Sequence, residues 1–226
     1  MNIPCRVSKL TQADKLLFSS IMNRAFARDP LFLHAFGDPE LDRESSSRTA
    51  AFVSFMFDKS FLLHEEIWSY YENEILLGTF IVEKPGISKL KRLKGAFLLI
   101  GRLLPLLFQL PVKTLRFLNA YMGMTRSAAP SSPHHYLIMI GVNPEVQGRG
   151  IGTAMLRHLL QVVNSDHNSH GIALDTENKG NVNLYQRWGF VLRHEEKINA
   201  LTVYCMFYRK TIFNDGAVRP FYIGRH

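Results

Sequence analysis

YLIMIGVNPEVQGRGIGTAMLRHLL, residues 136–160, is the stretch that decides the fold of this chain. Its apolar start predicts a buried strand over Tyr136–Val142, and the apolar periodicity after the turn predicts an amphipathic helix over Gly150–Asn164. Between them, Gln147–Gly152 holds three glycines and one arginine. Glycine keeps side chains away from backbone N–H groups, and the first turn of a helix offers unpaired N–H donors and the positive end of its dipole. The turn therefore predicts a phosphate or pyrophosphate site, with the Arg149 guanidinium beside it.

Other phosphate-binding patterns fit this turn less well. The P-loop requires a Lys followed by Ser or Thr after its last glycine, and neither is present. The dinucleotide fingerprint places G-x-G-x-x-G in an early strand–helix unit, whereas this turn has the order G-R-G-I-G past the middle of the chain. An ordinary strand-to-helix turn rich in glycine is the remaining alternative.

The rest of the chain predicts a mixed α/β sheet. A first strand over Ile3–Ser8 precedes a helix that ends near Asp29, with Ala13, Leu17, Ile21 and Met22 on its apolar face. The further elements that we expect are a helix over Glu40–Leu63, a hairpin of Ile67–Tyr71 with Ile75–Val82, a strand over Ile172–Asp175, a helix over Val182–Trp188 and a hairpin of Phe190–Glu196 with Ala200–Phe207. Strands that alternate with helices in the middle, with hairpins at both ends, indicate this class.

Two blocks of sequence resemble the GNAT superfamily of acyl-CoA-dependent N-acetyltransferases. The first is V-x-P-x-x-Q-G-R-G-I-G at Val142–Gly152, and the second is LDTENKGNVNLYQRWGF at Leu174–Phe190. The resemblance implies a mostly antiparallel central sheet with a splayed parallel strand pair, flanking helices and a helical insertion between strands 3 and 4. It also implies acetyl-CoA as cosubstrate. The runs at 134–142 and 176–190 look most like the branch that includes puromycin N-acetyltransferase.

The resemblance also implies roles for individual residues. The backbone of Ile140, Gly141 and Val142 would face pantetheine, and Asn178 would lie against the cofactor. Tyr185 would protonate the departing CoA thiolate; packing between helix and sheet is its alternative role. The residues that would face the pyrophosphate are Gln147, Gly148, Arg149, Gly150, Ile151, Gly152 and Thr153.

The general base is less clearly indicated. His134 is the first candidate, because a histidine titrates near neutral pH and the related branch often has one at this point. A purely structural histidine is the competing interpretation. Weaker candidates are His64, Glu65 and Glu66, and an amine that arrives neutral needs no dedicated base.

Composition limits the partners. The chain carries a formal net charge of +8, and residues 84–144 hold nine Lys or Arg and no Asp or Glu. Attraction of a polyanionic cofactor explains part of this charge more simply than nucleic-acid binding does, so we expect no nucleic acid. Cys5 and Cys205 lack metal-ligand spacing and are expected to be reduced. His167 and His170 lie on a polar turn, and we expect no metal.

The segment 86–133 is expected to form an apolar and basic helical insertion. Its apolar core, Ala96–Val112, is interrupted by Arg102, Pro105, Gln109 and Pro111, so its uninterrupted stretches are too short to span a membrane. A helix pair that packs over the sheet and covers the acceptor pocket is favoured over an interfacial membrane helix.

We expect one globular domain over 1–226, with a short tail at 214–226. The N-terminus lacks a signal-peptide pattern, so the expected location is cytoplasmic. The expected function is direct transfer of an acetyl group from acetyl-CoA to a small, apolar amine in a ternary complex, by a monomer or homodimer. Acetylation of a protein N-terminus or lysine is the second enzyme hypothesis. A non-catalytic acyl-CoA-binding or membrane-associated module is the hypothesis from another class.

Overall fold

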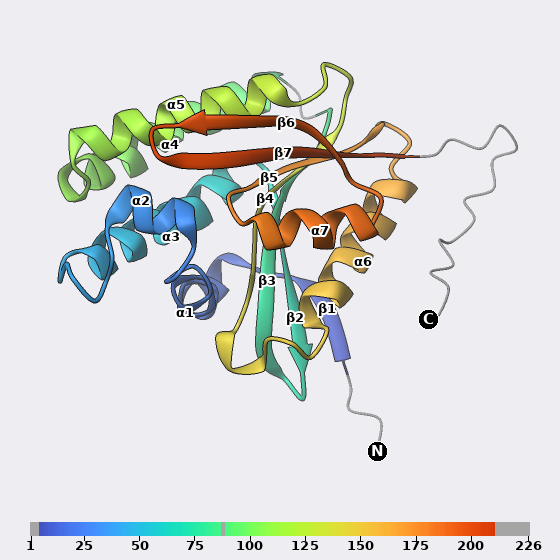
Figure 1. Cartoon of the computed structure of the whole chain (residues 1–226), viewed down its shortest axis with the longest axis horizontal. Coiled ribbons are helices and arrows are strands. Elements are labelled where there is room, and N and C mark those ends of the chain that lie inside the picture. Colours follow the sequence, from blue (N-terminus) through green and yellow to red (C-terminus); the bar gives the residue numbers. More distant parts are fainter. Residues whose placement is uncertain (1–4, 87–88, 211–226) are drawn as a thin grey trace, which may run out of the picture.

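The computed structural model describes residues 5–86 and 89–210, and its centre is a seven-stranded sheet (Figure 1). The predicted tail at 214–226 and the start of the predicted first strand lie outside the described residues. The strands are β1 (Cys5–Lys9), β2 (Glu66–Glu72), β3 (Ile75–Glu83), β4 (His135–Val142), β5 (Gly171–Thr176), β6 (Val191–Ile198) and β7 (Leu201–Arg209). The helices are α1 (Lys15–Ala25), α2 (Pro30–Phe36), α3 (Ser45–Leu62), α4 (Lys89–Gln109), α5 (Val112–Ala128), α6 (Ile151–Ser165) and α7 (Lys179–Arg187), with short 3-10 helices η1 (Gln12–Asp14) and η2 (Pro144–Val146).

The strand order is β1-β2-β3-β4-β5-β7-β6, and β4 with β5 is the parallel pair in an otherwise antiparallel sheet. This confirms the predicted mixed fold. The parallel pairing covers only His135–Leu137 against Ile172–Leu174. The register of β4 against β3 shifts directly afterwards, where Ile138 is the extra residue. A bulge of this kind bends the strand, so the far half of β4 stays paired with β3 while it parts from β5.

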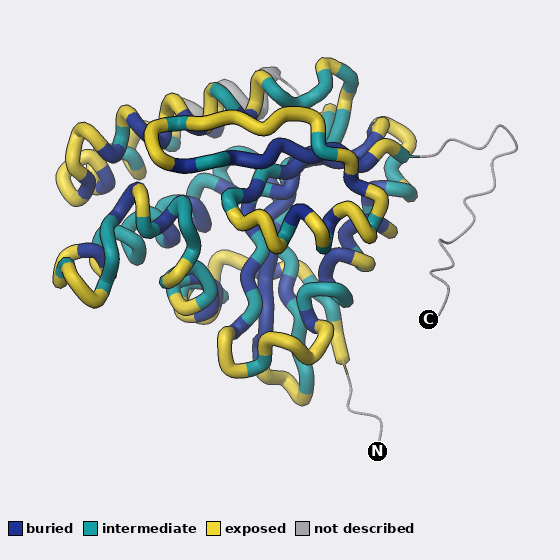
Figure 2. The backbone as a smooth tube through the Cα atoms, in the orientation of Figure 1, coloured by how far each residue is buried: buried dark blue, intermediate teal, exposed yellow. Residues whose placement is uncertain are grey.

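Helices cover both faces of the sheet, and each face has its own core. On one face, α1, α2, α3, α4 and α5 contribute a cluster that includes Phe18, Phe57 and Ile81. On the other face, α6 and α7 pack over a cluster that includes Phe80, Val82 and Leu159. Phe80, Ile81 and Val82 alternate between the two cores because successive strand residues point to opposite faces. Figure 2 shows the inner strands β3, β4, β5 and β7 as mostly buried, whereas the edge strand β6 is exposed.

The N-terminal helices differ from the prediction. The first helix ends at Ala25, and a second one, α2, begins at Pro30. Asp29 caps α2, because its carboxylate accepts hydrogen bonds from the N–H groups of Leu31 and Phe32 at 3.0 and 3.3 Å. Asp-Pro therefore marks a helix start here as well as an end. The predicted apolar face was also wrong at Leu17, which is 52% exposed, while its neighbour Phe18 is fully buried.

The segment between β3 and β4 forms a helical hairpin, as predicted. Helix α4 lies against α3, where a Cβ on Gly95 would come within 2.1 Å of the Leu62 carbonyl oxygen. Pro105 lies inside α4 rather than at its end, and Pro111 is the residue that precedes α5. Among the described residues, no helix is both long and apolar enough to cross a membrane.

Candidate active site

A cleft of about 670 Å³ opens where β4 and β5 separate. Its walls come from the end of α1, the far half of β4, the start of α6 and the inner face of α7. The sheet places these elements side by side although they span residues 24–185 of the chain. Eleven of the twelve residues that the sequence predicted for cofactor binding line this cleft: Ile140, Gly141, Val142, Gln147, Gly148, Gly150, Ile151, Gly152, Thr153, Asn178 and Tyr185.

The glycine-rich turn lies where the sequence predicted it, directly before α6. Gly148 and Gly150 both have φ near +81°, a conformation that side chains with a Cβ rarely adopt, and Gly150 directly precedes the first turn of α6. The leading N–H groups of α6 have no carbonyl earlier in the helix to bind, so they offer donors to an anion in the cleft.

Gly141 serves a different purpose. A Cβ at this position would lie 2.7 Å from the Met22 sulfur and 2.9 Å from the Ala25 Cβ. The absence of a side chain therefore lets α1 pack directly on β4 and form one wall of the cleft.

Arg149 is the predicted cofactor residue that the structure does not bring into the cleft lining. Its guanidinium instead forms an ion pair with Glu72 at the end of β2, with 2.5 Å between Nη2 and Oε2. Two arginines that sequence reasoning missed, Arg24 and Arg28, line the cleft from the end of α1 and the segment after it. No motif marks them, because their approach to the turn depends on how α1 packs on β4.

Asn178 and Tyr185 both lie on the β5–α7 side of the cleft. The Asn178 side chain also caps α7, since its Oδ1 accepts a hydrogen bond from the Gly180 N–H at 2.8 Å. Tyr185 is buried, and its ring packs against Phe190 with 5.4 Å between the ring centroids. Burial raises the pKa of the Tyr185 hydroxyl above its usual value, so this group holds its proton at neutral pH.

A second cavity of about 190 Å³ adjoins the cleft on the side of the insertion. The two share Phe26, Asp29, Ile140 and Asn181 in their linings, which makes them neighbouring parts of one site. Helix α5 supplies Leu118, Tyr121, Met122, Thr125 and Arg126 to the second cavity, whereas α4 supplies none of its described lining. Of the two helices of the predicted insertion, α5 therefore borders this second cavity and the described part of α4 does not.

Carboxyl groups gather in this second cavity. The Tyr121 hydroxyl contacts the carboxyl groups of both Asp175 and Glu177, and the Tyr136 hydroxyl contacts Asp175. Tyr121 has one proton to donate, so its contact with a second carboxyl calls for a proton on that carboxyl. Burial, followed by the charge of Asp175, raises the pKa of Glu177 to about 8. Burial likewise raises the pKa of Asp175 and, from the other side of the cavity, of Asp29.

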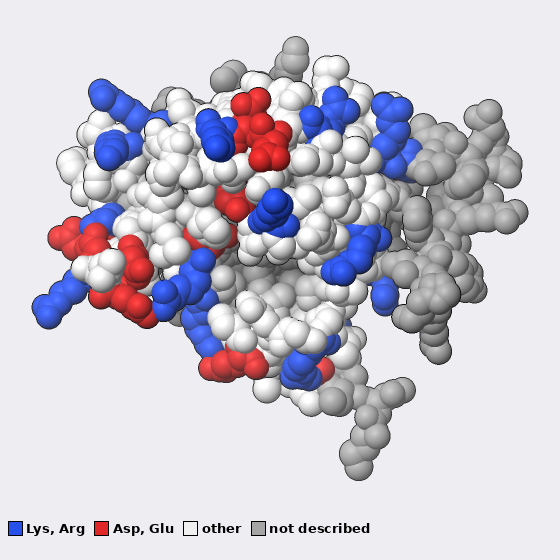
Figure 3. Space-filling model, in the orientation of Figure 1, with Lys and Arg blue, Asp and Glu red and all other residues white. Residues whose placement is uncertain are grey.

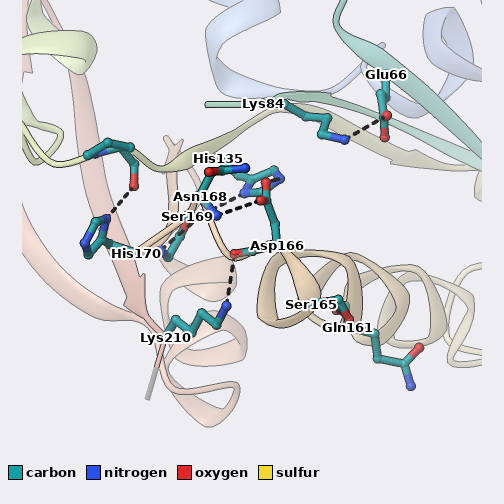
Figure 4. A network of polar contacts seen from close by, with 12 residues as sticks. Glu66, Lys84, His135, Gln161, Ser165, Asp166, Asn168, Ser169, His170 and Lys210 are labelled. Atoms are coloured by element: carbon teal, nitrogen blue, oxygen red, sulfur yellow. Dashed lines mark hydrogen bonds and ion pairs between the residues drawn. The ribbon is translucent and has the colours of Figure 1, made fainter. Parts of the chain in front are cut away.

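The structure does not bring His134 into the lining of either cavity. His134 precedes the paired end of β4, its Nδ1 lies 2.7 Å from the Ser132 carbonyl oxygen, and its ring packs edge-on against Phe207. The neighbouring His135 is fully buried, with Nδ1 2.9 Å from the Ser169 hydroxyl and Nε2 3.5 Å from Asp166 (Figure 4). Burial lowers the pKa of His135 to about 4, so it is neutral at pH 7.

The other predicted candidates for the base also lie outside the two linings. Glu65 is buried between Lys59 and Ser60, and Glu66 pairs with Lys9 at 2.7 Å. His64 ends the turn after α3 with a positive φ of 60°. His170 contacts the Pro133 carbonyl oxygen at 3.2 Å (Figure 4), and no metal-binding group of His, Cys, Asp and Glu occurs within residues 5–86 and 89–210.

On the face drawn in Figure 3, Lys and Arg side chains are interspersed with Asp and Glu side chains.

The site thus combines a helix start that offers N–H donors to an anion, two parallel strands that separate, and a neighbouring cavity lined by carboxyl groups. Solved structures share the fold that holds these parts. The structure described as histone acetyltransferase HPA2 and related acetyltransferase from Corynebacterium glutamicum has a TM-score of 0.67 and 20% identity, over 93% of this chain and 98% of that one.

Two further structures are similar. The ribosomal-protein-S18-alanine N-acetyltransferase of Escherichia coli has a TM-score of 0.53 and 14% identity, over 96% of this chain and 100% of that one. The yncA protein of Salmonella typhimurium, solved with its cofactor acetyl-CoA, has a TM-score of 0.51 and 15% identity, over 96% of this chain and 98% of that one. None of the curated proteins compared with the chain matches it.

Residues 112–190 match the model of the acetyltransferase (GNAT) family. That range contains the strand β4, the glycine-rich turn, α6 and α7. Over that range the chain is similar to this family, and the solved structures above share its fold.

Proposed function

We propose that this protein is an N-acetyltransferase that transfers the acetyl group of acetyl-CoA to the amine of a small molecule in a ternary complex. The observation that carries the proposal is the junction of the two cavities, where a cleft beside the start of α6 meets a smaller pocket lined by carboxyl groups. The first suits a cofactor with phosphates, and the second suits an amine.

The residues of the cleft fit acetyl-CoA. The first N–H groups of α6, with Gly148 and Gly150 open toward solvent, would bind the pyrophosphate. Arg24 and Arg28 line the same cleft, where they pair with Glu145 and Glu40, and would turn to the phosphates when the cofactor binds. The backbone of Ile140–Val142 lies past the last pairing with β5, so main-chain groups there are available to hydrogen-bond the pantetheine arm. Bound acetyl-CoA supplies the acetyl group as a thioester.

The chain's own residues would then position the reactants and move two protons. Holding both reactants in one site contributes most, on the order of 7–11 kcal/mol of the barrier. Glu177 accepts a proton from the amine nitrogen, whose bond to the acetyl carbon forms as the bond from that carbon to sulfur breaks. Tyr185 donates a proton to the departing sulfur, and solvent restores it. Backbone N–H groups near Ile140 would stabilise the negative charge on the carbonyl oxygen.

We assign the base to Glu177 because its place and its pKa both suit the task. It lines the cavity next to the cleft, while His134 lies outside both. A general base works best when its pKa is near the working pH, and the pKa of Glu177 is about 8. The carboxyl groups of Asp29 and Asp175 add negative charge that would attract an ammonium group.

The cavity also indicates the kind of acceptor. Its walls include Phe26, Phe32, Phe52, Tyr121 and Tyr136, which suit an apolar or aromatic body attached to the amine. A volume of about 190 Å³ holds such an arm and leaves no room for a folded protein surface. Membership of the puromycin N-acetyltransferase-like branch stays a prediction that this pocket chemistry supports.

Catalysis is tested by following thiol release from acetyl-CoA with a panel of acceptors: alkylamines, aryl-bearing amines, an aminonucleoside, a lysine peptide and a peptide with a free N-terminus. We expect the aryl-bearing amines to react best. Preference for either peptide would favour the protein-acetylation hypothesis, and CoA binding without turnover on any acceptor would favour a non-catalytic module.

The role of Tyr185 has its own test. Tyr185→Phe should lower kcat and leave the Kd for CoA nearly unchanged, because the hydroxyl acts on the departing thiolate. Tyr204→Phe, which removes a hydroxyl from another buried tyrosine on the same face of the sheet, is the matched control. Equal losses of turnover and CoA affinity in Tyr185→Phe would show that the residue only packs.

A further inference from the structure

Helix α4 has an apolar face that nothing in the described structure covers. The residues on the side away from α3 are Phe97, Leu98, Gly101, Leu104, Pro105 and Phe108. They recur at the three- and four-residue spacing of one helix face. Phe97 and Phe108 are 74% and 88% exposed, and Leu98 and Leu104 are each more than half exposed. We call these six residues the outer face of α4.

This face is not needed to hold α4 in place. The opposite side of the helix carries Gly95 and Leu106, and Leu110 follows directly after it; all three are buried against the rest of the protein. A contiguous exposed patch of Phe and Leu is unfavourable in water and is typical of a surface that meets a partner or a lipid phase. The outer face therefore needs a partner outside the described fold.

The charges around the outer face are positive. Lys94 lies at one end of it, and Lys113 and Arg116 follow it on α5; all three are exposed. Arg102 lies at its side and is 61% exposed, with 3.7 Å between its Nη1 and an oxygen of Asp58. Residues 84–144 contain no Asp or Glu, so the insertion itself has no acidic side chain to balance these cations.

We propose that the outer face of α4 binds the surface of an anionic lipid bilayer, with the helix axis parallel to the membrane. An apolar face between basic residues is the pattern of a helix that lies in the interface and pairs its cations with anionic headgroups. A second copy of the chain fits less well. Two outer faces brought together would place the basic residues of both copies next to each other without acidic partners from either insertion.

Binding in this way leaves the two cavities free. No described residue of α4 lines either of them, so the outer face can be changed without altering the linings. The proposal is thus independent of the proposed acetyl transfer. A protein without turnover could still bind vesicles, and an active one could fail to do so.

The test is co-sedimentation of the full chain with phosphatidylcholine vesicles that contain either no or about 30% phosphatidylserine. The double variant Phe97→Ser and Phe108→Ser should lose binding. Leu41→Ser is the matched control, because Leu41 is also 88% exposed but lies outside α4, and it should bind as the wild type does. Thermal unfolding should show that all three proteins are folded.

Charge is tested separately with Lys113→Gln and Arg116→Gln together. If each basic residue contributes about fivefold at an anionic surface, the loss of both should lower binding about twenty-five-fold. Raising the salt concentration should weaken wild-type binding in the same direction.

Three results would overturn the proposal. The first is equal binding of the wild type and the Phe97→Ser, Phe108→Ser variant to phosphatidylserine vesicles. The second is a homodimer in sedimentation velocity that this variant dissociates, with no vesicle binding, which would assign the face to self-association. The third is vesicle binding only after removal of residues 211–226, which would assign the face to that segment.

Discussion

Replacing Glu177 by Gln removes the proposed base and keeps the shape of the side chain. With a pKa of about 8, Glu177 is ionised in about one molecule in a hundred at pH 6 and about nine in ten at pH 9. The rate that depends on ionised Glu177 should therefore rise about ninetyfold across this range. At pH 9, where the base is almost fully available, its loss should lower kcat/KM by about 10²- to 10⁴-fold.

The assay measures kcat/KM for one amine in the wild type and in Glu177→Gln from about pH 6 to pH 9. The ratio of the two values cancels the titration of the amine itself. This ratio should increase with pH and level off above about 8. Glu195→Gln is the matched control, because Glu195 is an exposed glutamate on β6 outside both linings, and it should show no such change.

Stability gives a second readout for the same variant. The pKa of Glu177 is raised on folding from its usual 4.5 to about 8, so the folded protein holds this proton more tightly than the unfolded chain. The contribution of Glu177 to the free energy of unfolding is complete below about pH 4.5 and is lost as the pH rises through about 8. Chemical denaturation should show that the free energy of unfolding declines less between about pH 4.5 and about pH 8 in Glu177→Gln than in the wild type. A ratio of kcat/KM that stays constant with pH would refute the assignment of the base.

Three further predictions concern the cleft and the insertion. Arg24→Gln should weaken CoA binding in titration calorimetry more than Arg149→Gln does, because Arg24 lines the cleft; the reverse order would restore the role first predicted for Arg149. Gly150→Ala forces a Cβ into φ +81° and should cost about 1–2 kcal/mol in urea unfolding while weakening CoA binding, and an unchanged midpoint would contradict this. Leu106→Ala should lower the free energy of unfolding by about 2–5 kcal/mol because Leu106 is buried, whereas Phe108→Ala should change it by no more than about 0.5 kcal/mol because Phe108 is exposed. Equal losses in urea unfolding would contradict the assignment of a buried and an exposed face to α4.

The sequence by itself predicted most of the sheet and most of the residues that line the first cleft. The run at 136–160 holds the strand, the turn and the helix start in consecutive residues, so local backbone preference is enough to indicate an anion site. Gly148 and Gly150 have the positive φ that such a turn requires. The hairpin of β2 and β3 was equally predictable, because alternation and turn residues act over short distances.

Only the tertiary structure decided which residues line the proposed acceptor cavity. Asp29, Tyr121, Tyr136, Asp175 and Glu177 come from four separate parts of the chain, and no local pattern brings them together. Their meeting depends on the bulge in β4, on the parting of β4 from β5 and on the packing of α5 across that gap. Burial among these elements then raises the pKa of Glu177, a property that depends on its surroundings and not on its place in the sequence.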